Sequence, residues 1–201
     1  MVYRWDERYD QDEFIFGTEP NDFLREQAHR IPAAGKVLCL GDGEGRNGVW
    51  LAEQGYQVTS VDLSQVGLDK TRRFAKERGV SIETVYADLA EWPIEPQAWD
   101  GIVSIFCHMM PDERRRMHPR IVKGLKPGGV FLLEAYTPDQ IDKGTGGPSN
   151  PDLLVTAEDI IPEIDGLQVQ LAHNIERDVI EGTSHTGRAS VTQIIATLIE
   201  N

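Results

Sequence analysis

Cysteine is scarce in this sequence, and long apolar runs are missing. Its two cysteines, Cys39 and Cys107, each lie inside a short apolar run, which excludes a disulfide framework, and neither has a partner at a metal-binding spacing. No stretch of about 18 apolar residues is present, so no transmembrane helix is predicted. The opening residues 1–6 are polar rather than an apolar targeting core. We therefore expect a cytoplasmic protein without a bound metal or a membrane partner.

Positive charge is also in deficit. The chain has 33 acidic and 20 basic residues, a net charge of −13 at pH 7, and a mean field of that sign repels nucleic acids. The basic residues that do cluster have no aromatic residues between them, and we interpret them as a solvated helix face. They are Arg114, Arg115, Arg116, Arg120, Lys123 and Lys126. We therefore expect a small-molecule partner and no nucleic acid.

The order of apolar runs along the 201 residues predicts one α/β domain. Runs at 36–40, 57–61, 82–86, 100–106 and 129–135 are separated by helical patterns, which is typical of a parallel sheet with helices on both faces. Two β-rich runs, 168–180 and 188–199, flank a Gly-rich turn at 181–187 and predict a closing antiparallel hairpin.

The domain divides into four stretches. Residues 1–35 form an N-terminal cap segment with a helix-like stretch at 21–30, and residues 36–136 form the core. Residues 137–155 hold too many prolines and glycines for regular structure, and we interpret them as a mobile cover over the site. Residues 156–201 supply a short helix and the hairpin.

Several residues mark the expected ends of helices. Ser64 is placed to cap a helix that Gly79 ends, and Pro111 opens another at its first turn. Pro119 should kink or restart that helix, because proline lacks the backbone N–H that an interior position donates. Residues 126–129, Lys-Pro-Gly-Gly, predict a tight turn into the fifth strand.

A glycine-rich loop between the first strand and the first core helix is the strongest functional signal. Gly41, Gly43 and Gly45 permit a sharp turn and a close approach to a ligand, and the following helix presents its N-terminal N–H groups. Asp62 closes the next strand about 20 residues on, where a carboxylate accepts hydrogen bonds from two ribose hydroxyls. The pattern predicts a nucleoside-cofactor site.

The register of the loop separates two kinds of cofactor. Residues 43–48 match the dinucleotide pattern Gly-x-Gly-x-x-Gly, but the first glycine of that pattern directly follows the strand. Here that glycine is Gly41, which puts Arg46 where the third glycine is needed. No tyrosine has a lysine four positions on, as short-chain reductases would require. A nicotinamide or flavin dinucleotide is therefore disfavoured against S-adenosylmethionine.

The chain resembles the class I S-adenosylmethionine-dependent methyltransferases, and within them the small bacterial enzymes related to tellurite-resistance methyltransferases. The resemblance covers most of residues 36–199. It is carried by five segments in the family's order, 37–47, 61–64, 87–89, 99–104 and 125–129. It implies a Rossmann-like fold, a mostly parallel seven-stranded sheet with helices on both faces and a C-terminal antiparallel hairpin.

The resemblance also implies a set of cofactor contacts. The loop glycines line the methionine and ribose portion, Asp62 accepts from the ribose hydroxyls, and Leu63 flanks the adenine. Asp88 with Leu89 reaches the adenine amino group, and a turn cap is the lesser alternative for Asp88. The implied cofactor-binding residues are Gly41, Asp42, Gly43, Gly45, Arg46, Asn47, Asp62, Leu63, Asp88, Leu89 and Phe106.

Two positions depart from the family's loop, and Phe106 has a role of its own. Cys39 stands where relatives commonly carry an acidic residue, and Asp42 where they often carry cysteine. An interaction that the family makes from the strand is therefore missing or is supplied from the loop. Phe106 follows the fourth strand and is expected to border the sulfonium end of the cofactor.

Acceptor-side groups belong at the carboxyl edge of the sheet, where ligands bind in open parallel folds. His108 and Tyr136 follow the fourth and fifth strands, and His185 with Arg188 reaches this edge if the second hairpin strand lies antiparallel beside the fifth. The alternatives are a packed or capping His108 and an exposed turn His185. Trp5 and Tyr9 either fold over the cofactor or pack the cap segment.

These residues predict methyl transfer by in-line displacement to a small acceptor, in a monomer or a homodimer. The cofactor supplies the electrophile, so alignment is the protein's main contribution and no catalytic triad is required. A non-catalytic cofactor-sensing or partner-binding module on the same fold is the first alternative. An NAD-dependent oxidoreductase is the second.

Overall fold

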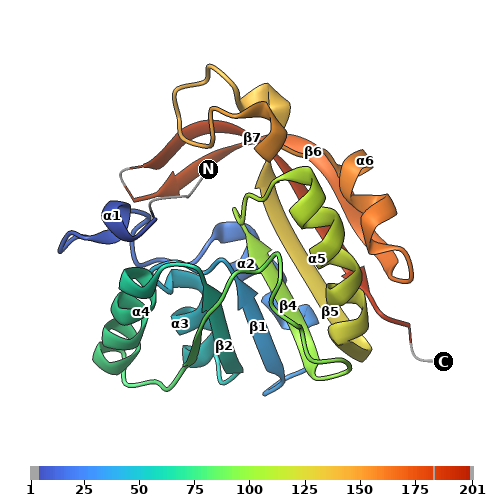
Figure 1. The fold of residues 1–201 in the computed structure, drawn as a ribbon, viewed down its shortest axis with the longest axis horizontal. Helices are drawn as coiled ribbons and strands as arrows, with labels where there is room; N and C mark the ends of the chain where they lie inside the picture. Colours follow the sequence, from blue (N-terminus) through green and yellow to red (C-terminus); the bar gives the residue numbers. More distant parts are fainter. Residues whose placement is uncertain (1–4, 183, 200–201) are drawn as a thin grey trace.

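The computed structural model describes residues 5–182 and 184–199, so residues 1–4 of the polar opening and Thr183 of the hairpin turn lie outside it. Its strands form one sheet in the order β3-β2-β1-β4-β5-β7-β6 (Figure 1). They are β1 Lys36–Leu40, β2 Gln57–Asp62, β3 Glu83–Tyr86, β4 Trp99–Ile105, β5 Leu125–Tyr136, β6 Gln168–Glu181 and β7 His185–Thr197. The predicted sheet of seven strands is confirmed.

The hairpin closes the sheet as the sequence predicts. Strands β1 to β5 pair in parallel, whereas β7 lies antiparallel between β5 and β6. Tyr136 at the end of β5 is opposite Val191 of β7, so the start of β7 reaches the carboxyl edge of the parallel strands. The turn is shorter than expected, and His185 is the first residue of β7 rather than part of a loop.

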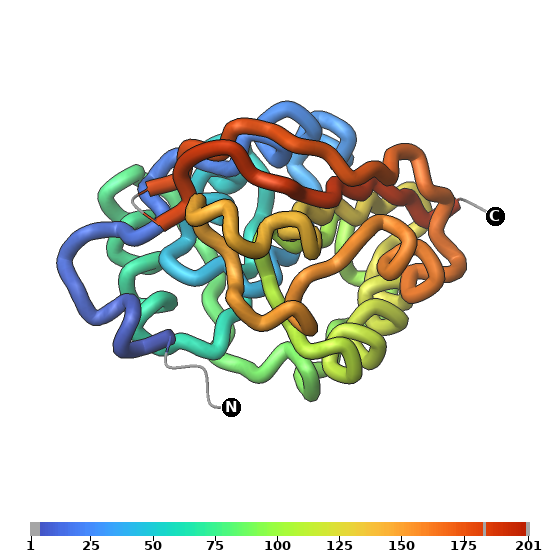
Figure 2. Tube along the Cα trace, turned by 90° about the horizontal axis from the view of Figure 1, so that it is seen from above, coloured from blue at the N-terminus to red at the C-terminus, as the bar shows by residue number. Residues whose placement is uncertain are grey.

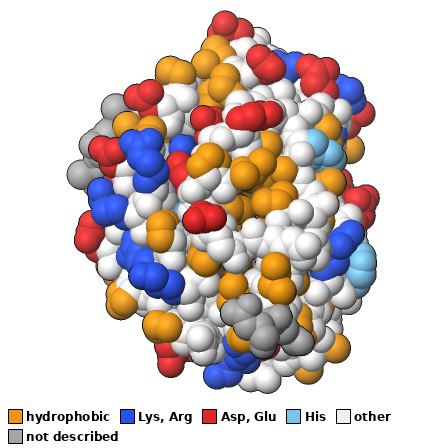
Figure 3. Space-filling model, turned by 90° about the vertical axis from the view of Figure 1, so that its right-hand side faces the viewer, with side chains coloured by type: hydrophobic (Ala, Val, Ile, Leu, Met, Phe, Trp, Pro, Cys, Tyr) orange, Lys and Arg blue, Asp and Glu red, His pale blue; other side chains and the backbone are white. Residues whose placement is uncertain are grey.

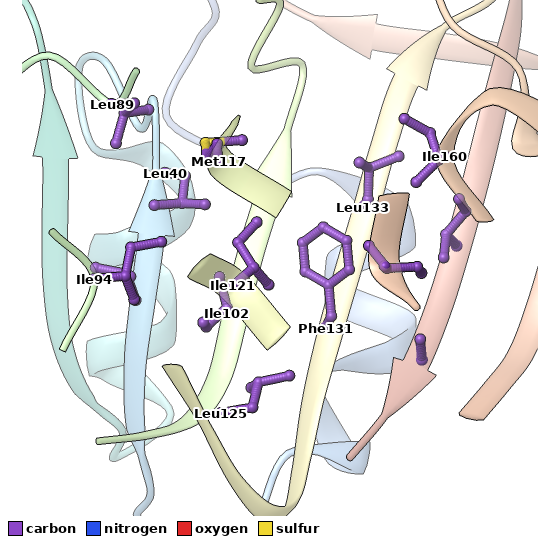
Figure 4. Close-up of a cluster of buried hydrophobic side chains, with 14 of the residues drawn as sticks. Leu40, Leu89, Ile94, Ile102, Met117, Ile121, Leu125, Phe131, Leu133 and Ile160 are labelled. Carbon is purple, nitrogen blue, oxygen red and sulfur yellow. The ribbon is translucent and has the colours of Figure 1, made fainter. Parts of the chain in front are cut away.

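Helices cover both faces of the sheet because side chains alternate along each strand. Leu38 and Leu40 of β1 face a cluster that includes Met117 and Ile121 of α5 (Figure 4). Val37 and its neighbours on the other face pack against the N-terminal helices. The helices are α1 Trp5–Tyr9, α2 Asp22–Gln27, α3 Arg46–Glu53, α4 Gln65–Glu77, α5 Pro111–Gly124 and α6 Ala157–Ile160, with 3₁₀ turns η1 Ala28–Arg30, η2 Pro138–Gln140, η3 Pro151–Leu153 and η4 Ile161–Ile164.

Most predicted helix ends are confirmed, but Pro119 neither ends nor restarts its helix. Ser64 accepts from Gly67 N at 3.0 Å as the N-cap of α4, and Pro111 is the first residue of α5. Pro119 lies on the exposed side of α5, away from the sheet. Buried Met117 on the opposite side holds the helix against the sheet, so α5 continues to Gly124.

The predicted tight turn at 126–129 is wrong. Strand β5 already begins at Leu125, which pairs with Trp99, and the register shifts before Gly101 pairs with Val130. Gly128 has a φ of 80° and donates to Leu198 O at 2.7 Å. The glycine therefore allows a bulge in a continuing strand rather than a separate turn.

The long segment 137–155 does cover the carboxyl edge, and it is tied down there. Gln140 donates to Gly146 O at 2.9 Å and accepts from Ser190 N of β7 at 2.9 Å. A Cβ added at Gly146 would lie 2.8 Å from His185 Cδ2, and one at Gly147 would lie 3.0 Å from Tyr136 Cδ2. The segment therefore packs directly on two predicted acceptor-side residues. Figure 2 shows the trace of this segment beside that of the hairpin.

Candidate active site

The glycine-rich loop is pressed closely by its neighbours. Gly41, Gly43 and Gly45 all have positive φ, of 61°, 59° and 87°. A Cβ added at Gly41 would lie 2.7 Å from Cys107 Sγ, and one at Gly43 would lie 2.5 Å from Tyr9 Oη. Because only glycine tolerates both the conformation and the contact, Gly41 and Gly43 let Cys107 and Tyr9 pack directly on the backbone of the loop.

Asp62 ends β2 beside this loop. Its carboxylate accepts from Gly43 N and from Ser64 N, both at 2.8 Å, and the residue is only 6% exposed. Burial raises the pKa of the Asp62 carboxyl above its ordinary value, and the backbone N–H donors oppose that shift. The structure thus places a buried carboxylate next to the loop at the carboxyl edge of the sheet.

Three other predicted cofactor residues face protein partners. Asp42 turns inward, where its carboxylate accepts from Ser60 Oγ at 2.5 Å and from Gly48 N at 3.2 Å. Burial raises the pKa of Asp42 to about 7. Arg46 donates to Glu181 at 2.6 Å, and Asn47 accepts from the backbone N of Asn21. In the described geometry, these side chains brace the loop from behind.

The predicted adenine-side residues differ in exposure. Leu63 is 43% exposed, whereas Leu89 is buried in the core cluster under α5. Asp88 is exposed and accepts from Ala90 N at 2.9 Å, which is the turn-capping role weighed from the sequence. Only Leu63 of these presents a large exposed apolar side chain beside Asp62.

The N-terminal cap segment folds over the glycine-rich loop. Tyr9 is buried with its hydroxyl above Gly43, and its ring stacks on Trp5 with centroids 5.4 Å apart. The Arg8 guanidinium lies 5.3 Å from the ring centroids of both Trp5 and Phe16. Burial raises the pKa of Tyr9 well above its ordinary value, so the phenol remains a hydrogen-bond donor. The segment therefore supplies one wall of the site.

The predicted acceptor-side residues come together around Phe106. His108 stacks on Tyr136 with centroids 5.6 Å apart, and His185 meets the Tyr136 ring edge-on at 5.3 Å. Phe106, whose φ of 52° is in the left-handed region, contacts Tyr136 at 4.5 Å and His185 at 5.1 Å. A non-glycine residue in that conformation is uncommon and marks a backbone forced into place by its surroundings.

The alternative of an exposed turn histidine is wrong, and so is the expectation for Arg188. His185 is buried, at 8% exposed, and its ring lies 4.5 Å from that of Phe16 in the cap segment. Arg188 points to solvent and pairs with Glu176 and Asp178 on β6. Because His185 and Arg188 are three positions apart on β7, their side chains point to opposite faces of the sheet.

Three polar atoms of this cluster are buried without a hydrogen-bond partner in residues 5–182 and 184–199. They are His108 Nε2, Tyr136 Oη and His185 Nδ1. The nearest charged group to His185 Nδ1 is Glu181 Oε2 at 3.6 Å, too long for a hydrogen bond. His108 Nδ1 lies 3.2 Å from Leu153 O, which requires the proton on Nδ1 and leaves Nε2 with a lone pair.

Burial dominates the titration of the cluster. It lowers the pKa of His108 to about 4, with a smaller contribution from His185, and it lowers the pKa of His185 below its ordinary value. It raises the pKa of Tyr136 beyond its ordinary range. Near neutral pH the two imidazoles are therefore uncharged and the phenol keeps its proton. Unpaired buried polar groups are costly, which makes the cluster a candidate ligand site.

A buried ionic network behind the cluster was not predicted from the sequence. Glu134 accepts from Arg177 and Gln193, while Glu181 accepts from Arg46. Asn21 Nδ2 donates to both carboxylates at 2.7 Å. We call Asn21, Arg46, Glu134, Arg177 and Glu181 the buried carboxylate network. The sequence signal for this network is an acidic residue within an apolar strand, as in Leu-Leu-Glu-Ala-Tyr at 132–136, because a buried carboxylate needs a partner.

The basic cluster on α5 is largely neutralised rather than simply solvated. Arg114 makes two hydrogen bonds to the Glu163 carboxylate at 2.9 Å, and Arg120 donates to the carbonyl of Trp92 at 2.7 Å. Arg115, Arg116 and Lys126 each pair with an acidic side chain. Figure 3 shows acidic and basic side chains side by side on one face of the molecule.

Neither a metal centre nor a membrane span is found in the part of the chain that the structure describes. No three His, Cys, Asp or Glu side chains of these residues gather in a way that would hold a metal ion. No described helix is long and apolar enough to cross a membrane.

Comparisons with known proteins bear on the fold and on the class of protein. Residues 37–129 match the family model described as a methyltransferase domain. The chain is 29% identical over 118 residues to the tRNA 5-carboxymethoxyuridine methyltransferase of Escherichia coli, covering 57% of this chain and 45% of that one. It spans less than half the length of the first curated relatives that it matches.

Two further relatives bear on the class. TehB of Haemophilus influenzae, named a probable S-adenosyl-L-methionine-dependent methyltransferase, is 32% identical over 54% of this chain and 38% of its own. A solved structure of TehB from that organism superposes with a TM-score of 0.70 at 19% identity, covering 86% of this chain and 60% of that one. The thiopurine S-methyltransferase of Pseudomonas fluorescens is 23% identical over 95% of this chain and 92% of its own.

Residues 37–129 therefore form a methyltransferase domain, and the chain is similar in sequence and in fold to class I S-adenosylmethionine-dependent methyltransferases of the TehB type. S-adenosylmethionine is the cofactor of this class. The residues present fit it, because the loop after β1 has left-handed glycines at 41, 43 and 45 and Asp62 sets a buried carboxylate beside that loop. The predicted family and cofactor are confirmed.

Proposed function

We propose that the protein transfers a methyl group from S-adenosylmethionine to a small-molecule acceptor. The observation that carries this proposal is the meeting of His108, Tyr136 and His185 at the carboxyl edge that also holds the glycine-rich loop. Three strands far apart in sequence deliver these side chains to one place. Their buried, unpaired polar atoms are suited to a ligand that they enclose.

In this proposal the chain's residues bind the cofactor and orient its methyl group. Gly41, Gly43 and Gly45 let the cofactor approach the backbone, and Asp62 accepts from its ribose hydroxyls. Leu63 lies against the adenine, and Phe106 borders the end that carries the methyl group. Bound S-adenosylmethionine supplies a methyl group on a positively charged sulfur. The remaining predicted contacts, Asp42, Arg46, Asn47, Asp88 and Leu89, hold the surrounding backbone in place.

Several observations support a small acceptor rather than a nucleic acid. The acceptor-side cluster is covered by Phe16 of the cap segment and by Gly146 and Gly147 of residues 137–155. The arginines of α5 are paired with acids or with backbone carbonyls, and the chain's net charge is −13. The relative that spans almost the whole chain is named for thiopurine, whereas the tRNA methyltransferase is similar over about half of it.

Calorimetry and a turnover assay test the proposal. We expect S-adenosylmethionine and S-adenosylhomocysteine to bind and NAD not to bind. We expect methyl transfer from labelled cofactor to at least one member of a panel of thiols, phenols, amines and chalcogen oxyanions. Binding without turnover on the whole panel would favour the non-catalytic cofactor-sensing module, and binding of NAD alone would favour an oxidoreductase.

We also propose a cytoplasmic protein that is a monomer or a homodimer. Both cysteines are free thiols, which suits the cytoplasmic location that we propose. A monomer or a homodimer is proposed because the enclosed site draws its side chains from one chain. Light scattering over a concentration series measures the state directly.

A further inference from the structure

We propose that Glu181 positions His185 to remove a proton from the methyl acceptor, so that the acceptor is a protic group: a hydroxyl, a thiol or an amine. This inference rests on the proposed methyl transfer and adds the acceptor's chemistry to it. Nothing in the family match or the relatives' names assigns a role to Glu181 or to its partners.

The geometry of the hairpin carries the inference. Glu181 ends β6, His185 begins β7, and the two are opposite each other in the strand register. Glu181 Oε2 lies 3.6 Å from His185 Nδ1 and 2.6 Å from the Arg46 guanidinium. At this distance the two groups interact by charge: a carboxylate on the Nδ1 side of an imidazole favours the proton on Nδ1 and leaves the Nε2 lone pair as the base.

The charge on Glu181 gives His185 a different electrostatic environment from His108, the other histidine of the cluster. His108 has only the Leu153 carbonyl on its Nδ1 side, so the imidazolium that it would form has no counter-charge there. Across from His185 Nδ1 stands a buried carboxylate that is held ionised. Although burial raises the pKa of Glu181, its contacts with His185, Arg46 and Asn21 bring it to about 2. A proton arriving at His185 is therefore stabilised, and one arriving at His108 is not.

Charged and titratable groups face His185 from every neighbouring element. Glu181 of β6 favours the protonated form, whereas Arg46 of α3 and Arg8 of α1 oppose it. His108, after β4, stacks on the Tyr136 ring that His185 meets edge-on, and the Tyr136 phenol of β5 keeps its proton. Together with burial, these groups keep His185 neutral at pH 7, which a proton acceptor requires.

The proposed step balances as follows. The acceptor's O–H, S–H or N–H proton passes to His185 Nε2, and the electron pair left on the acceptor atom forms the new bond to the methyl carbon. The pair of the broken carbon–sulfur bond stays on sulfur, which becomes a neutral thioether. The proton on the imidazole then passes to solvent. Glu181 changes neither its protonation nor its bonds during the step.

The buried carboxylate network fixes Glu181 in this place. Asn21 donates to Glu181 Oε1 at 2.7 Å, Arg46 donates to Oε2, and Arg177 approaches within 3.7 Å. Two arginines and two glutamates make the network neutral, so its burial does not leave an uncompensated charge. Arg46 is also the first residue of α3, directly after the glycine-rich loop. The acceptor base is thus braced by the same helix that follows the cofactor loop.

A matched pair of isosteric variants tests Glu181 without needing an acceptor. Glu181→Gln removes the charge beside His185, and Glu134→Gln removes the other network carboxylate, which also contacts Asn21 and Arg177 but not His185. Nitrogen NMR of histidine-labelled protein, assigned with His185→Gln, reads the tautomer and the titration midpoint of each ring. We expect the Nδ1–H tautomer at His185 in the wild type.

The two variants are expected to diverge. Glu181→Gln shifts the titration midpoint of His185 down by about one pH unit, because it removes the negative charge that stabilises the imidazolium. Glu134→Gln leaves the His185 midpoint in place. An Nε2–H tautomer, or an unshifted midpoint in Glu181→Gln, would overturn the inference. If Glu181→Gln does not fold, Arg46→Gln tests the same link with the opposite sign: removing a positive charge raises the midpoint, and no change refutes the link.

Kinetics then test the acceptor class. With a thiol, phenol or amine acceptor, His185→Gln is expected to lower kcat/KM by about 10²- to 10⁴-fold, and Glu181→Gln by tenfold or more, with its acid limb moved to lower pH. A wild type that methylates selenite at its lone pair but no protic acceptor would keep the proposed methyltransferase and overturn this inference. A protein that binds no S-adenosylhomocysteine would instead overturn the proposed function.

Discussion

The Lys70 ammonium lies 2.6 Å from the Glu44 carboxylate, and both side chains are almost completely buried. Lys70 of α4 also donates to the backbone carbonyls of Tyr9, Gln11 and Glu13, at 3.2, 2.8 and 2.6 Å. Glu44 on the glycine-rich loop accepts from Ile15 N with its other oxygen. This pair therefore fastens the cap segment both to the glycine-rich loop and to α4.

Replacing Lys70 with alanine should release the cap segment. The change leaves Glu44 buried without its counter-charge, and breaking a buried pair in this way costs about 3–5 kcal/mol. Urea unfolding measures the loss, and limited proteolysis is expected to cut within residues 10–20. Arg72→Ala is the control on the same helix, because its exposed ion pair with Asp69 contributes about 0–1 kcal/mol. Equal losses in the two variants would contradict the fastening role.

Gly43 and Gly79 form a second matched pair. Both have positive φ, of 59° and 71°, but a Cβ at Gly43 would meet Tyr9 Oη at 2.5 Å, whereas one at Gly79 would meet nothing within 4 Å. Gly79→Ala should cost about 1–2 kcal/mol from its left-handed conformation alone. Gly43→Ala should cost more and should weaken S-adenosylhomocysteine binding. Similar unfolding free energies would show that Tyr9 is not held against the loop.

Asp62→Ala is expected to weaken binding of S-adenosylhomocysteine by about 1.5–3 kcal/mol, the usual value of a hydrogen bond to a charged group. Calorimetry measures the affinity, and circular dichroism checks that the fold is kept. Asp100→Ala is the control, since that carboxylate binds Lys126 and the backbone of Lys36 at the opposite edge of the sheet. If both variants bind the cofactor product like the wild type, Asp62 is not a ligand.

The order of the core elements was predictable because its signals are local. Ser64 caps its own helix, Gly79 ends it, and the alternation of β1 side chains can be read from Val37 to Leu40. The placement of β7 followed from strand topology, which brought His185 to the right edge. Local chemistry and topology were therefore enough to predict the sheet and the place where the predicted acceptor-side residues meet.

Long-range pairing was not predictable in the same way. Arg46 and Glu181 are 135 positions apart, and nothing near Arg46 in the sequence indicates that it turns away from the cofactor loop. Asp42 likewise finds its partner, Ser60, only when β2 lies beside the loop. Pro119 does not restart its helix, because buried side chains such as Met117 hold α5 against the sheet, and that packing is not a property of local sequence.

Asp42 should make the protein less stable as pH rises from about 4 to about 7. Burial raises its folded-state pKa from 3.8 to about 7, so in this window the folded state holds a proton that the unfolded state has lost. Stability falls with pH wherever the folded state binds more protons, and the full loss is on the order of 4 kcal/mol. Below the unfolded pKa both states are protonated, and above pH 7 both are ionised.

Asp42→Asn isolates this contribution, because the amide keeps the shape and an acceptor oxygen while it removes the ionisation. Urea unfolding at several pH values between 4 and 8 should show the wild type losing stability relative to Asp42→Asn as pH rises, with the difference constant above about pH 7. Other titrating groups, including Asp62 and His185, are common to both proteins and cancel in the comparison. Parallel curves for the two proteins would mean that Asp42 ionises near its ordinary pKa and that its inward hydrogen bonds to Ser60 and Gly48 offset its burial.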